Sequence, residues 1–426
     1  MIQKIIKRDI FPKTSGHLLK PEITLILGPR QSGKTTLLFQ LKDFLEKEKQ
    51  IDPSQIRFFN LDLVEDLQYF QDQTTLLQII KRETSHNKKL YLFVDEAQRI
   101  KNAGLFFKGI YDAKLPLKLV LTGSSALEIK AKIYEPLTGR KRIFLLMPFS
   151  FSEYLLIRAP HLLSLLKIDP QKIALPEHEQ LKRVYTSYLV SGGYPKAVLA
   201  ESFQEEQENL IEIFNSYIEK DIISFLGYQD RISFANLLRL LAAQAGSLVN
   251  TNELSRTLGI TRPTVERYLQ ALEATFIIVP FYPYSANLRK VIRKMPKIFF
   301  LDNGLRNTAL KSWSSWNQRV DQGALFEQSV AILLWREFHQ LMNLFFFRTT
   351  IGTEVDFILE KENKLCFIET KIQLSAKKDL KRLIRIASLL KSKKIFIVTL
   401  EHKTQQTINQ GITIKYCNPW NFLQEI

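Results

Sequence analysis

The chain has 426 residues, which is long enough for two to four domains with separate cores. Sixty lysine and arginine residues against 43 aspartate and glutamate residues leave a net charge of +17. This charge favours a polyanionic partner, and we expect nucleic acid rather than a membrane surface. The opening MIQKIIKRDI is charged too early for a signal peptide, and no apolar run reaches membrane-span length, so we expect a cytoplasmic protein. Two cysteines and scattered histidines suggest neither a disulfide framework nor a zinc site.

A phosphate-binding loop is the first motif along the chain. The stretch LILGPRQSGKTTLL, Leu25 to Leu38, has the spacing G-x-x-x-x-G-K-[ST] between an apolar run over Ile23–Leu27 and a helical pattern over Thr36–Lys47. In such a loop backbone N–H groups surround phosphates, the lysine meets the outer phosphates and the hydroxyl binds Mg²⁺. The flanking strand and helix argue against a chance glycine-rich turn. The predicted nucleotide-binding residues are Gly28, Pro29, Arg30, Gln31, Ser32, Gly33, Lys34, Thr35 and Thr36.

An acidic motif follows in LYLFVDEAQ, Leu90 to Gln98, where an apolar strand ends in Asp95 and Glu96. We expect Thr35 and Asp95 to hold Mg²⁺ and Glu96 to orient and deprotonate the attacking water. A solvated acid pair at a strand end is the alternative, but acids directly behind an apolar run and downstream of a P-loop favour an ATPase. The sequence therefore predicts ATP hydrolysis, with ATP and Mg²⁺ as cofactors.

Two weaker candidates come next. The apolar strand in LKLVLTGSSALEI ends in the hydroxyls of Thr122, Ser124 and Ser125, and Ser124 is a candidate to sense the outer phosphate or position water. Hydroxyls at a strand end are also ordinary turn and cap residues. Arg140 in LTGRKRIF is a candidate arginine finger or sensor, with a solvated basic turn as the alternative.

The middle of the chain changes pattern twice. The pattern over residues 149 to about 226 predicts mostly helix. Over residues 231 to 284 the pattern predicts helices at Phe234–Ala245 and Thr251–Leu258, and a turn follows at Gly259. A third helix in TRPTVERYLQALEA and a strand over Phe276–Phe281 complete this region. This is a helix-turn-helix pattern with a wing, which contacts either DNA or a protein. The candidates for contact with nucleic acid are Arg262, Thr264, Arg267 and Gln270.

Basic residues recur in three clusters, each of which fits either phosphate contact or a solvated surface. They are Arg140 to Arg142, then Arg289, Lys290, Arg293, Lys294 and Lys297, and then Lys377, Lys378, Lys381, Arg382 and Arg385.

The C-terminal third carries acids and a lysine in a second pattern. A helix over Gly323–His339 contains Glu327, strands surround Gly352 in FFFRTTIGTEVDFILE, and a further strand follows in LCFIETKI. Together these residues resemble the PD-(D/E)XK nuclease constellation, in which acids hold a divalent metal and the lysine activates water. Alternating charge on an exposed strand is the other interpretation, and cleavage itself stays open. The candidate metal ligands are Asp356, Glu369 and Glu327, and the candidate catalytic residue is Lys371.

The whole set of motifs resembles a family of prokaryotic AAA+ type P-loop ATPases, chiefly archaeal and bacterial. The strings that carry the resemblance are GPRQSGKTTL, FVDEAQ, LTGSSALEI, LTGRKRIF, SGGYPKAVL, YIEKDI and FLDNGLRN. The resemblance implies an α/β P-loop AAA+ ATPase core at 1–148, a helical lid or connector at 149–228, a winged-helix domain at 229–312 and a restriction-endonuclease-like α/β domain at 313–426. It also implies a homo-oligomer, with a hexamer as one form. A second sensor arginine after Arg142, which the family pattern includes, is not evident.

Two functions of different class follow from these motifs. In the first, the protein is an ATPase that moves along or remodels nucleic acid, DNA rather than RNA, and the C-terminal domain cuts it. In the second, it is a nucleotide-controlled regulatory switch whose nuclease-like and winged-helix parts only bind partners. The Glu369-x-Lys371 pair favours the first, and the missing second sensor favours the second.

Overall fold

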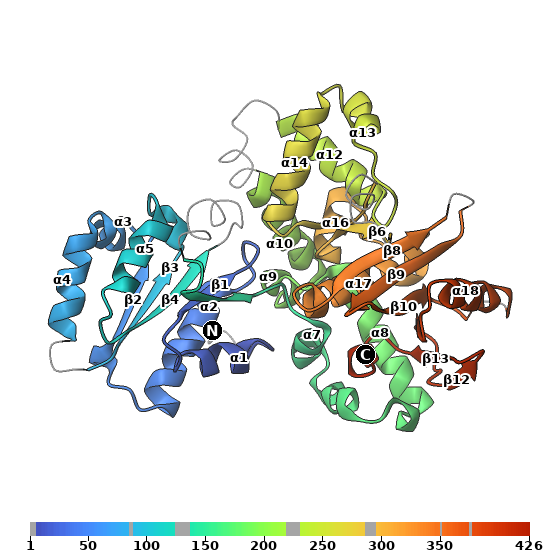
Figure 1. The fold of residues 1–426 in the computed structure, drawn as a ribbon, viewed down its shortest axis with the longest axis horizontal. Helices are drawn as coiled ribbons and strands as arrows, with labels where there is room; N and C mark the ends of the chain where they lie inside the picture. The colour runs from blue at the N-terminus through green and yellow to red at the C-terminus, as the bar shows by residue number, and fades with distance from the viewer. Residues whose placement is uncertain are drawn as a thin grey trace. The chain divides into compact units, whose positions relative to one another are not determined.

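The structure, a computed structural model, describes residues 6–84, 88–123, 137–218, 231–285, 295–349, 352–374 and 377–426 (Figure 1). They fall into two compact units. The N-terminal unit is Met1–Glu153 with Ala274–Phe276, and the C-terminal unit is Tyr154–Glu273 with Ile277–Ile426. Among these residues, no helix combines the length and the apolar character that crossing a membrane requires.

The N-terminal unit is built on a five-stranded sheet in the order β2-β3-β4-β1-β5, and all of its neighbouring strands run parallel. Strand β4 therefore lies between the strand that precedes the P-loop and the strand that ends in Asp95. Parallel strands place their C-terminal ends at one edge of the sheet, so the predicted nucleotide motifs share that edge. The strands are β1 (Ile23–Leu27), β2 (Ile56–Asn60), β3 (Leu90–Asp95), β4 (Leu117–Gly123) and β5 (Lys141–Leu145).

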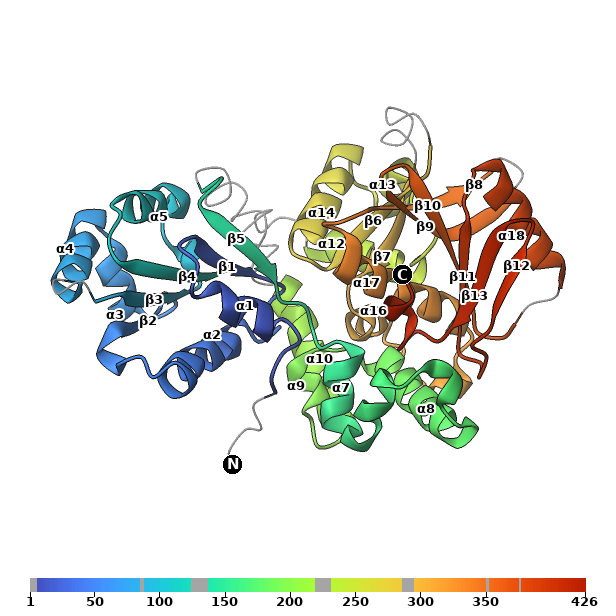
Figure 2. The ribbon, with the colours of Figure 1, turned by 60° about the horizontal axis from the view of Figure 1, so that its bottom comes forward.

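Helices cover both faces of this sheet because its strands are apolar on both sides. Leu25 and Leu27 of β1 pack in a cluster with α4 and α5, while Ile26 between them packs with α1 and α2. Figure 2 shows these two pairs of helices on opposite sides of the sheet. The arrangement confirms the predicted α/β class with a parallel sheet. The helices are α1 (Phe11–His17), α2 (Lys34–Asp43), α3 (Val64–Leu67), α4 (Gln73–Glu83) and α5 (Ala103–Asp112).

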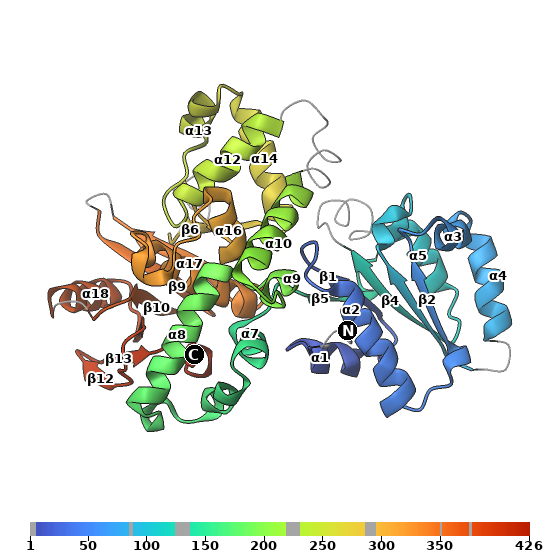
Figure 3. The same cartoon turned by 180° about the vertical axis from the view of Figure 1, so that it is seen from behind.

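The C-terminal unit begins with helices and contains a helix-turn-helix arrangement. Asn250 caps α13 by accepting hydrogen bonds from the N–H groups of Asn252 and Glu253, and Gly259 ends that helix with φ of +67° before α14 starts. Figure 3 shows α16 beside α10 and α12. The helices are α7 (Phe151–Arg158), α8 (Leu175–Ser191), α9 (Pro195–Val198), α10 (Phe203–Ser216), α12 (Arg231–Ala243), α13 (Thr251–Leu258), α14 (Arg262–Ala274), α16 (Asn303–Leu310), α17 (Gln322–Phe338) and α18 (Lys377–Leu389).

The strands of this unit form one mixed sheet of eight strands in the order β12-β13-β11-β10-β9-β8-β6-β7. Strands β6 and β7, which follow the helix-turn-helix, pair with each other antiparallel, and β6 also pairs parallel with β8. The segment predicted as a wing is thus continuous with the C-terminal sheet, and the division into four domains stays a prediction. The strands are β6 (Ile278–Pro283), β7 (Lys297–Phe300), β8 (Asn343–Arg348), β9 (Glu354–Lys361), β10 (Lys364–Lys371), β11 (Lys394–Thr399), β12 (Gln406–Asn409) and β13 (Ile412–Cys417).

Two strings that the sequence left without a role, SGGYPKAVL and FLDNGLRN, pack against each other. Buried Asp302 caps α16 by accepting a hydrogen bond from the N–H of Leu305 at 2.9 Å, and it also accepts one from the N–H of Gly193 at 2.8 Å. A Cβ atom at Gly304 would overlap the carbonyl oxygen of Ser191, so this close approach needs glycine. The two strings therefore form one structural joint.

Candidate functional site

The P-loop lies at the C-terminal end of β1, and its lysine begins α2. Gly33 has φ of +94°, a conformation that glycine adopts without strain. A Cβ atom at Gly28 would overlap the carbonyl oxygen of Leu146, so glycine is needed where the loop passes the end of β5. The Nζ of Lys34 donates hydrogen bonds to the carbonyl oxygens of Gly28 at 3.2 Å and Pro29 at 2.9 Å, which hold the ammonium group inside the loop.

Asp95 connects the P-loop to the neighbouring strands. Its carboxylate is buried and accepts a hydrogen bond from the Oγ1 of Thr35 at 2.5 Å on one oxygen and one from the Oγ1 of Thr122 on the other. Hydroxyl and carboxylate oxygens are the hard ligands that Mg²⁺ takes in proteins. The pair of Thr35 and Asp95 therefore fits the predicted ion, because both oxygens lie together beside the loop.

Glu96 is held in a special backbone conformation. Its φ and ψ are +56° and +44°, a left-handed conformation that costs a residue with a side chain about 1–3 kcal/mol. Its N–H donates a hydrogen bond to Thr122 Oγ1 at 3.0 Å, and its carboxylate accepts one from the side-chain amide of Gln98. These contacts fix the orientation of Glu96 directly after Asp95.

Arg8 is a site residue that the sequence did not indicate. Its guanidinium is buried, pairs with Glu153 at 2.8 Å, and donates hydrogen bonds to the carbonyl oxygens of Ser32 at 2.7 Å and Met147 at 2.6 Å. It therefore anchors the P-loop backbone to the segment that follows β5. Its acidic partner is 145 residues away in the chain, so no local pattern marks the pair.

The two weaker candidates have different outcomes. Ser124 lies outside the described residues, whereas Thr122 of the same hydroxyl cluster contacts Asp95. Arg140 precedes β5, at the sheet edge where β1 begins, and its guanidinium pairs with Asp112 at 2.8 Å. The five residues of β1 separate this edge from the P-loop by about 15 Å. An arginine-finger role for Arg140 would therefore require the nucleotide of another copy.

The residues predicted to contact nucleic acid lie on α14. Arg262, Arg267 and Gln270 are exposed and Thr264 is half-buried, while Val265 and other apolar residues of the helix face the core. Arg262, Arg267 and Gln270 thus face solvent from the second helix of the helix-turn-helix. Arg262 also pairs with Glu266 one turn along the same helix at 2.7 Å.

The acids of the C-terminal pattern come from three elements and lie close together. The N–H and Oγ1 of Thr370 donate hydrogen bonds to the carboxylate of Asp356 at 2.8 and 2.7 Å. Lys371 Nζ pairs with buried Glu369 at 2.8 Å, and Arg382 of α18 lies 3.4 Å from the same oxygen. The fold thus places Asp356 of β9 close to Glu369 of β10, as the constellation predicts. These two carboxylates form hydrogen bonds and ion pairs with Thr370, Lys371 and Arg382.

Lys297 of β7 is the residue that changes the chemistry of this cluster. It is buried, pairs with Glu327 of α17 at 2.8 Å, and also contacts Glu354. Although burial opposes it, the carboxylates of Glu327 and Asp356 raise the pKa of Lys297, so the ammonium stays charged. The sequence pattern groups Lys297 with the basic residues from Arg289 onward, as a phosphate contact or a solvated surface. In the structure, Lys297 is buried and balances the charge of Glu327 and Glu354.

The acids of this cluster are paired with cations of the chain, and their role as metal ligands stays a prediction. Among the described residues, no group of three or more histidine, cysteine, aspartate or glutamate side chains is placed to hold one. Burial, with Asp356 nearby, raises the pKa of both Glu327 and Glu369, while Lys297 and Lys371 oppose this shift by pairing with the two side chains. The cluster is therefore charge-compensated by the chain.

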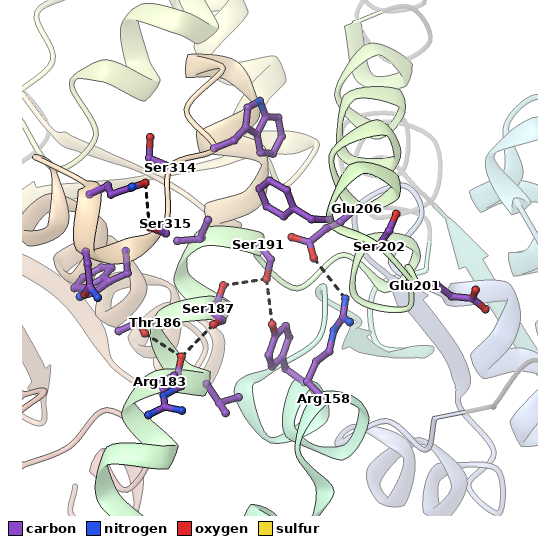
Figure 4. Close-up of a pocket in the computed structure, with 18 residues that line it drawn as sticks. Arg158, Arg183, Thr186, Ser187, Ser191, Glu201, Ser202, Glu206, Ser314 and Ser315 are labelled. Carbon is purple, nitrogen blue, oxygen red and sulfur yellow. Dashed lines mark hydrogen bonds and ion pairs between the residues drawn. The ribbon is translucent and has the colours of Figure 1, made fainter.

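The C-terminal unit also has a pocket of about 850 Å³ that no motif predicted. Helices α7, α8 and α10 and the residues before α17 line it (Figure 4). Arg158 pairs with Glu206 at 3.4 Å across it, and burial raises the pKa of Glu206. The Oγ of Ser191 lies 3.5 Å from the hydroxyl of Tyr154. Its lining mixes aromatic and hydroxyl groups with two arginines and two glutamates, so its charges are balanced.

Three family models match separate parts of the chain. Residues 20–155 match one described as an AAA domain, residues 182–315 match a domain of unknown function (DUF8612), and residues 322–419 match a domain of unknown function (DUF4143). With the loop and sheet described above, the first match makes residues 20–155 a P-loop domain of the AAA type. The other two descriptions name no chemistry.

Relatives and solved structures extend over more of the chain. An uncharacterized protein of Haemophilus influenzae is 26% identical over 406 residues, which cover 93% of this chain and 94% of that protein. One of Methanocaldococcus jannaschii is 27% identical over 339 residues, which cover 74% of this chain and 68% of that protein. A Walker-type ATPase of Pyrococcus abyssi is 18% identical with a TM-score of 0.44, covering 72% of this chain and 96% of that structure.

Proposed function

We propose that the protein binds ATP with Mg²⁺, hydrolyses it, and uses the cycle to act on nucleic acid, DNA rather than RNA. The observation that carries this proposal is the hydrogen-bonded array of Thr35, Asp95, Thr122 and Glu96 beside the P-loop. A P-loop alone binds phosphate. The acid pair Asp95 and Glu96 at the end of β3 adds a ligand for Mg²⁺ and a base for the attacking water, which hydrolysis needs.

Each residue of the array has a distinct role in this proposal. The loop backbone from Gly28 to Gly33 binds phosphates, and Lys34 supplies positive charge to the outer ones. Thr35 and Asp95 would hold Mg²⁺, which neutralises phosphate charge when it is bound. The Glu96 carboxylate takes the proton of the attacking water, and the amide of Gln98 keeps that carboxylate oriented.

The nucleic-acid part of the proposal rests on charge. The chain carries a formal charge of +17, and α14 presents arginines on its exposed side. By family analogy we also propose a cytoplasmic homo-oligomer, such as a hexamer, in which Arg140 would serve a neighbour's nucleotide. Arginines on an exposed helix of a helix-turn-helix are suited to phosphate and base contacts.

Removing both arginines of α14 should weaken DNA binding. We expect Arg262→Gln with Arg267→Gln to lower DNA affinity about tenfold near physiological salt. The slope of log affinity against log salt concentration should fall by about 1.4 to 1.8, because the variant loses two phosphate contacts and the counterions that they release. Fluorescence anisotropy over a salt series measures both. The control is Arg239→Gln with Lys311→Gln, which removes two exposed charges from the same unit. Equal affinity in the α14 variant and the control would move the contact elsewhere.

The compensated acid cluster favours a binding role for the C-terminal sheet, as in the regulatory-switch alternative. We propose that this sheet holds partners and does not cut DNA, because Lys297, Lys371 and Arg382 already neutralise its carboxylates. A buried carboxylate paired with an internal lysine gives up that pairing before it can take a metal.

The cleavage experiment separates the two roles of this sheet. Wild-type protein with Mg²⁺ or Mn²⁺ should leave single-stranded, duplex and branched DNA intact on denaturing gels while ATP turnover runs. Metal-dependent cutting that Lys371→Ala and Asp356→Ala each abolish, with DNA affinity kept, would establish a nuclease and contradict the binding role. Those two variants are chosen because one removes the lysine that would activate water and the other a carboxylate that would hold the metal.

A further inference from the structure

A second basic site lies in the N-terminal unit, at the sheet edge opposite the P-loop. It is a pocket of about 680 Å³ between the end of α1, the turn into β1 and the start of β5. We call it the sheet-edge pocket; its lining includes Lys13, His17, Lys20, Glu22, Lys141 and Arg142. Because β1 starts at this pocket and ends at the P-loop, the two sites are separate.

The lining of the sheet-edge pocket is strongly positive. Lys13, Lys20, Lys141 and Arg142 contribute four cations against the single acid Glu22. Within the described part of the chain, no ion pair joins an acid to Lys20 or Arg142. In the same basic run, by contrast, Arg140 pairs with Asp112. Arg140 is therefore neutralised, whereas Arg142, two residues later, lines the pocket.

Buried Lys118 fixes the shape of the pocket from beneath. Its Nζ donates hydrogen bonds to the carbonyl oxygens of Lys20 at 3.0 Å and of Glu22, and it lies 3.4 Å from His17 Nδ1. These bonds hold the turn that carries Lys20 against β4. Burial, followed by the nearby Lys118, lowers the pKa of His17 to about 4, and burial also lowers the pKa of Lys118 itself to about 7.

His17 itself is neutral at pH 7 and sets one wall of the pocket. Its Nδ1 lies 2.8 Å from Thr24 Oγ1 and its Nε2 lies 3.8 Å from the Glu22 carboxylate. The ring packs edge-on against Phe144 with centroids 5.2 Å apart. Glu22 thus lies on the histidine side of the pocket, and the lysine and arginine side chains are the lining groups whose charge attracts an anion.

We propose that the sheet-edge pocket binds phosphate groups of a DNA backbone, a proposal that rests on the nucleic-acid function proposed above. A DNA backbone is favoured over a free phosphate ion because the cations are spread around a pocket of about 680 Å³. Cations spaced in this way can contact successive phosphates of one strand. A single small anion can instead be enclosed by backbone N–H groups, as in the P-loop. The pocket gives the ATPase unit its own contact with DNA, apart from α14.

The test removes two exposed cations of the pocket. We expect Lys20→Gln with Arg142→Gln to lower DNA affinity about tenfold and to reduce the salt slope by about 1.4 to 1.8, the counterion release of two phosphate contacts on single or double strands. Fluorescence anisotropy of the full chain, without nucleotide, measures both. The matched control is Lys47→Gln with Arg82→Gln, which removes one lysine and one arginine that are exposed in the same unit and lie outside the pocket.

The outcomes separate this proposal from the function on which it rests. Wild-type protein that fails to bind DNA would overturn both. Wild-type binding with equal affinity and salt slope in the pocket variant and the control would overturn the pocket assignment and leave the function standing. Calorimetry with inorganic phosphate tests the other source: saturable binding that the pocket variant loses, with DNA affinity unchanged, would also overturn the assignment to a DNA backbone.

Discussion

Replacing Glu96 with glutamine is expected to lower ATP turnover by a factor on the order of 10² to 10⁴ while nucleotide affinity stays within a few-fold of wild type. Glutamine keeps the shape of the side chain and an oxygen that can accept the hydrogen bond from Gln98, but it cannot take a proton from water. The P-loop contacts to phosphate do not involve this carboxylate, so binding persists. Steady-state phosphate release and binding of a fluorescent ATP analogue measure the two quantities.

Two further variants make the Glu96 experiment specific. Lys34→Ala should lose nucleotide binding itself, because the ammonium group held inside the loop is removed. Glu65→Gln, an exposed acid of the same unit, should leave turnover unchanged. Equal ATPase rates in wild type and Glu96→Gln would contradict the assignment of Glu96 as the base.

Replacing Asp302 with alanine should have the largest effect on stability, lowering the free energy of unfolding by about 2–4 kcal/mol. The variant loses the cap of α16 and leaves the buried N–H groups of Leu305 and Gly193 without their acceptor. Asp302→Asn keeps an acceptor oxygen and should recover much of the loss. Chemical denaturation of the three proteins measures the difference, and unchanged stability in Asp302→Ala would contradict the role of the joint.

The pH dependence of the same residue gives an independent measurement. Burial, against the hydrogen bonds from backbone N–H groups, raises the pKa of Asp302 from 3.8 to about 6. A carboxyl whose pKa is higher when folded stabilises the native state below its unfolded pKa, and this stabilisation is lost as the pH rises through the folded value. Wild-type stability should therefore lose this contribution between about pH 4 and 6, whereas the asparagine variant lacks that component of the pH dependence.

Local patterns predicted the parts of the site that are close in sequence. The P-loop with its flanking strand and helix, and the strand ending in Asp95, are visible because each motif lies beside the element that positions it. The helix-turn-helix segments are similar: the helix over Thr251–Leu258 was expected at the bounds that α13 has. Side-chain spacing is enough where the contacts are made within one turn or one strand.

Contacts between distant segments were beyond the reach of such patterns. Arg8 holds the P-loop through Glu153, and Asp302 joins Gly193 across 109 residues, so neither pair leaves a local signal. The pairing of β6 with β8 is likewise set by tertiary packing. Lys297 is the clearest case, since only the fold shows that a lysine in a basic run is buried between carboxylates.

ATP turnover measured with and without DNA tests the central claim most directly. The full chain should hydrolyse ATP in a Mg²⁺-dependent manner, and single-stranded, duplex or branched DNA should raise the rate severalfold, because the proposed DNA contacts and the nucleotide site belong to one working cycle. Glu96→Gln serves as the blank for contaminating ATPases. Turnover that equals this blank, or that is the same with every DNA at concentrations where DNA is bound, would contradict the account.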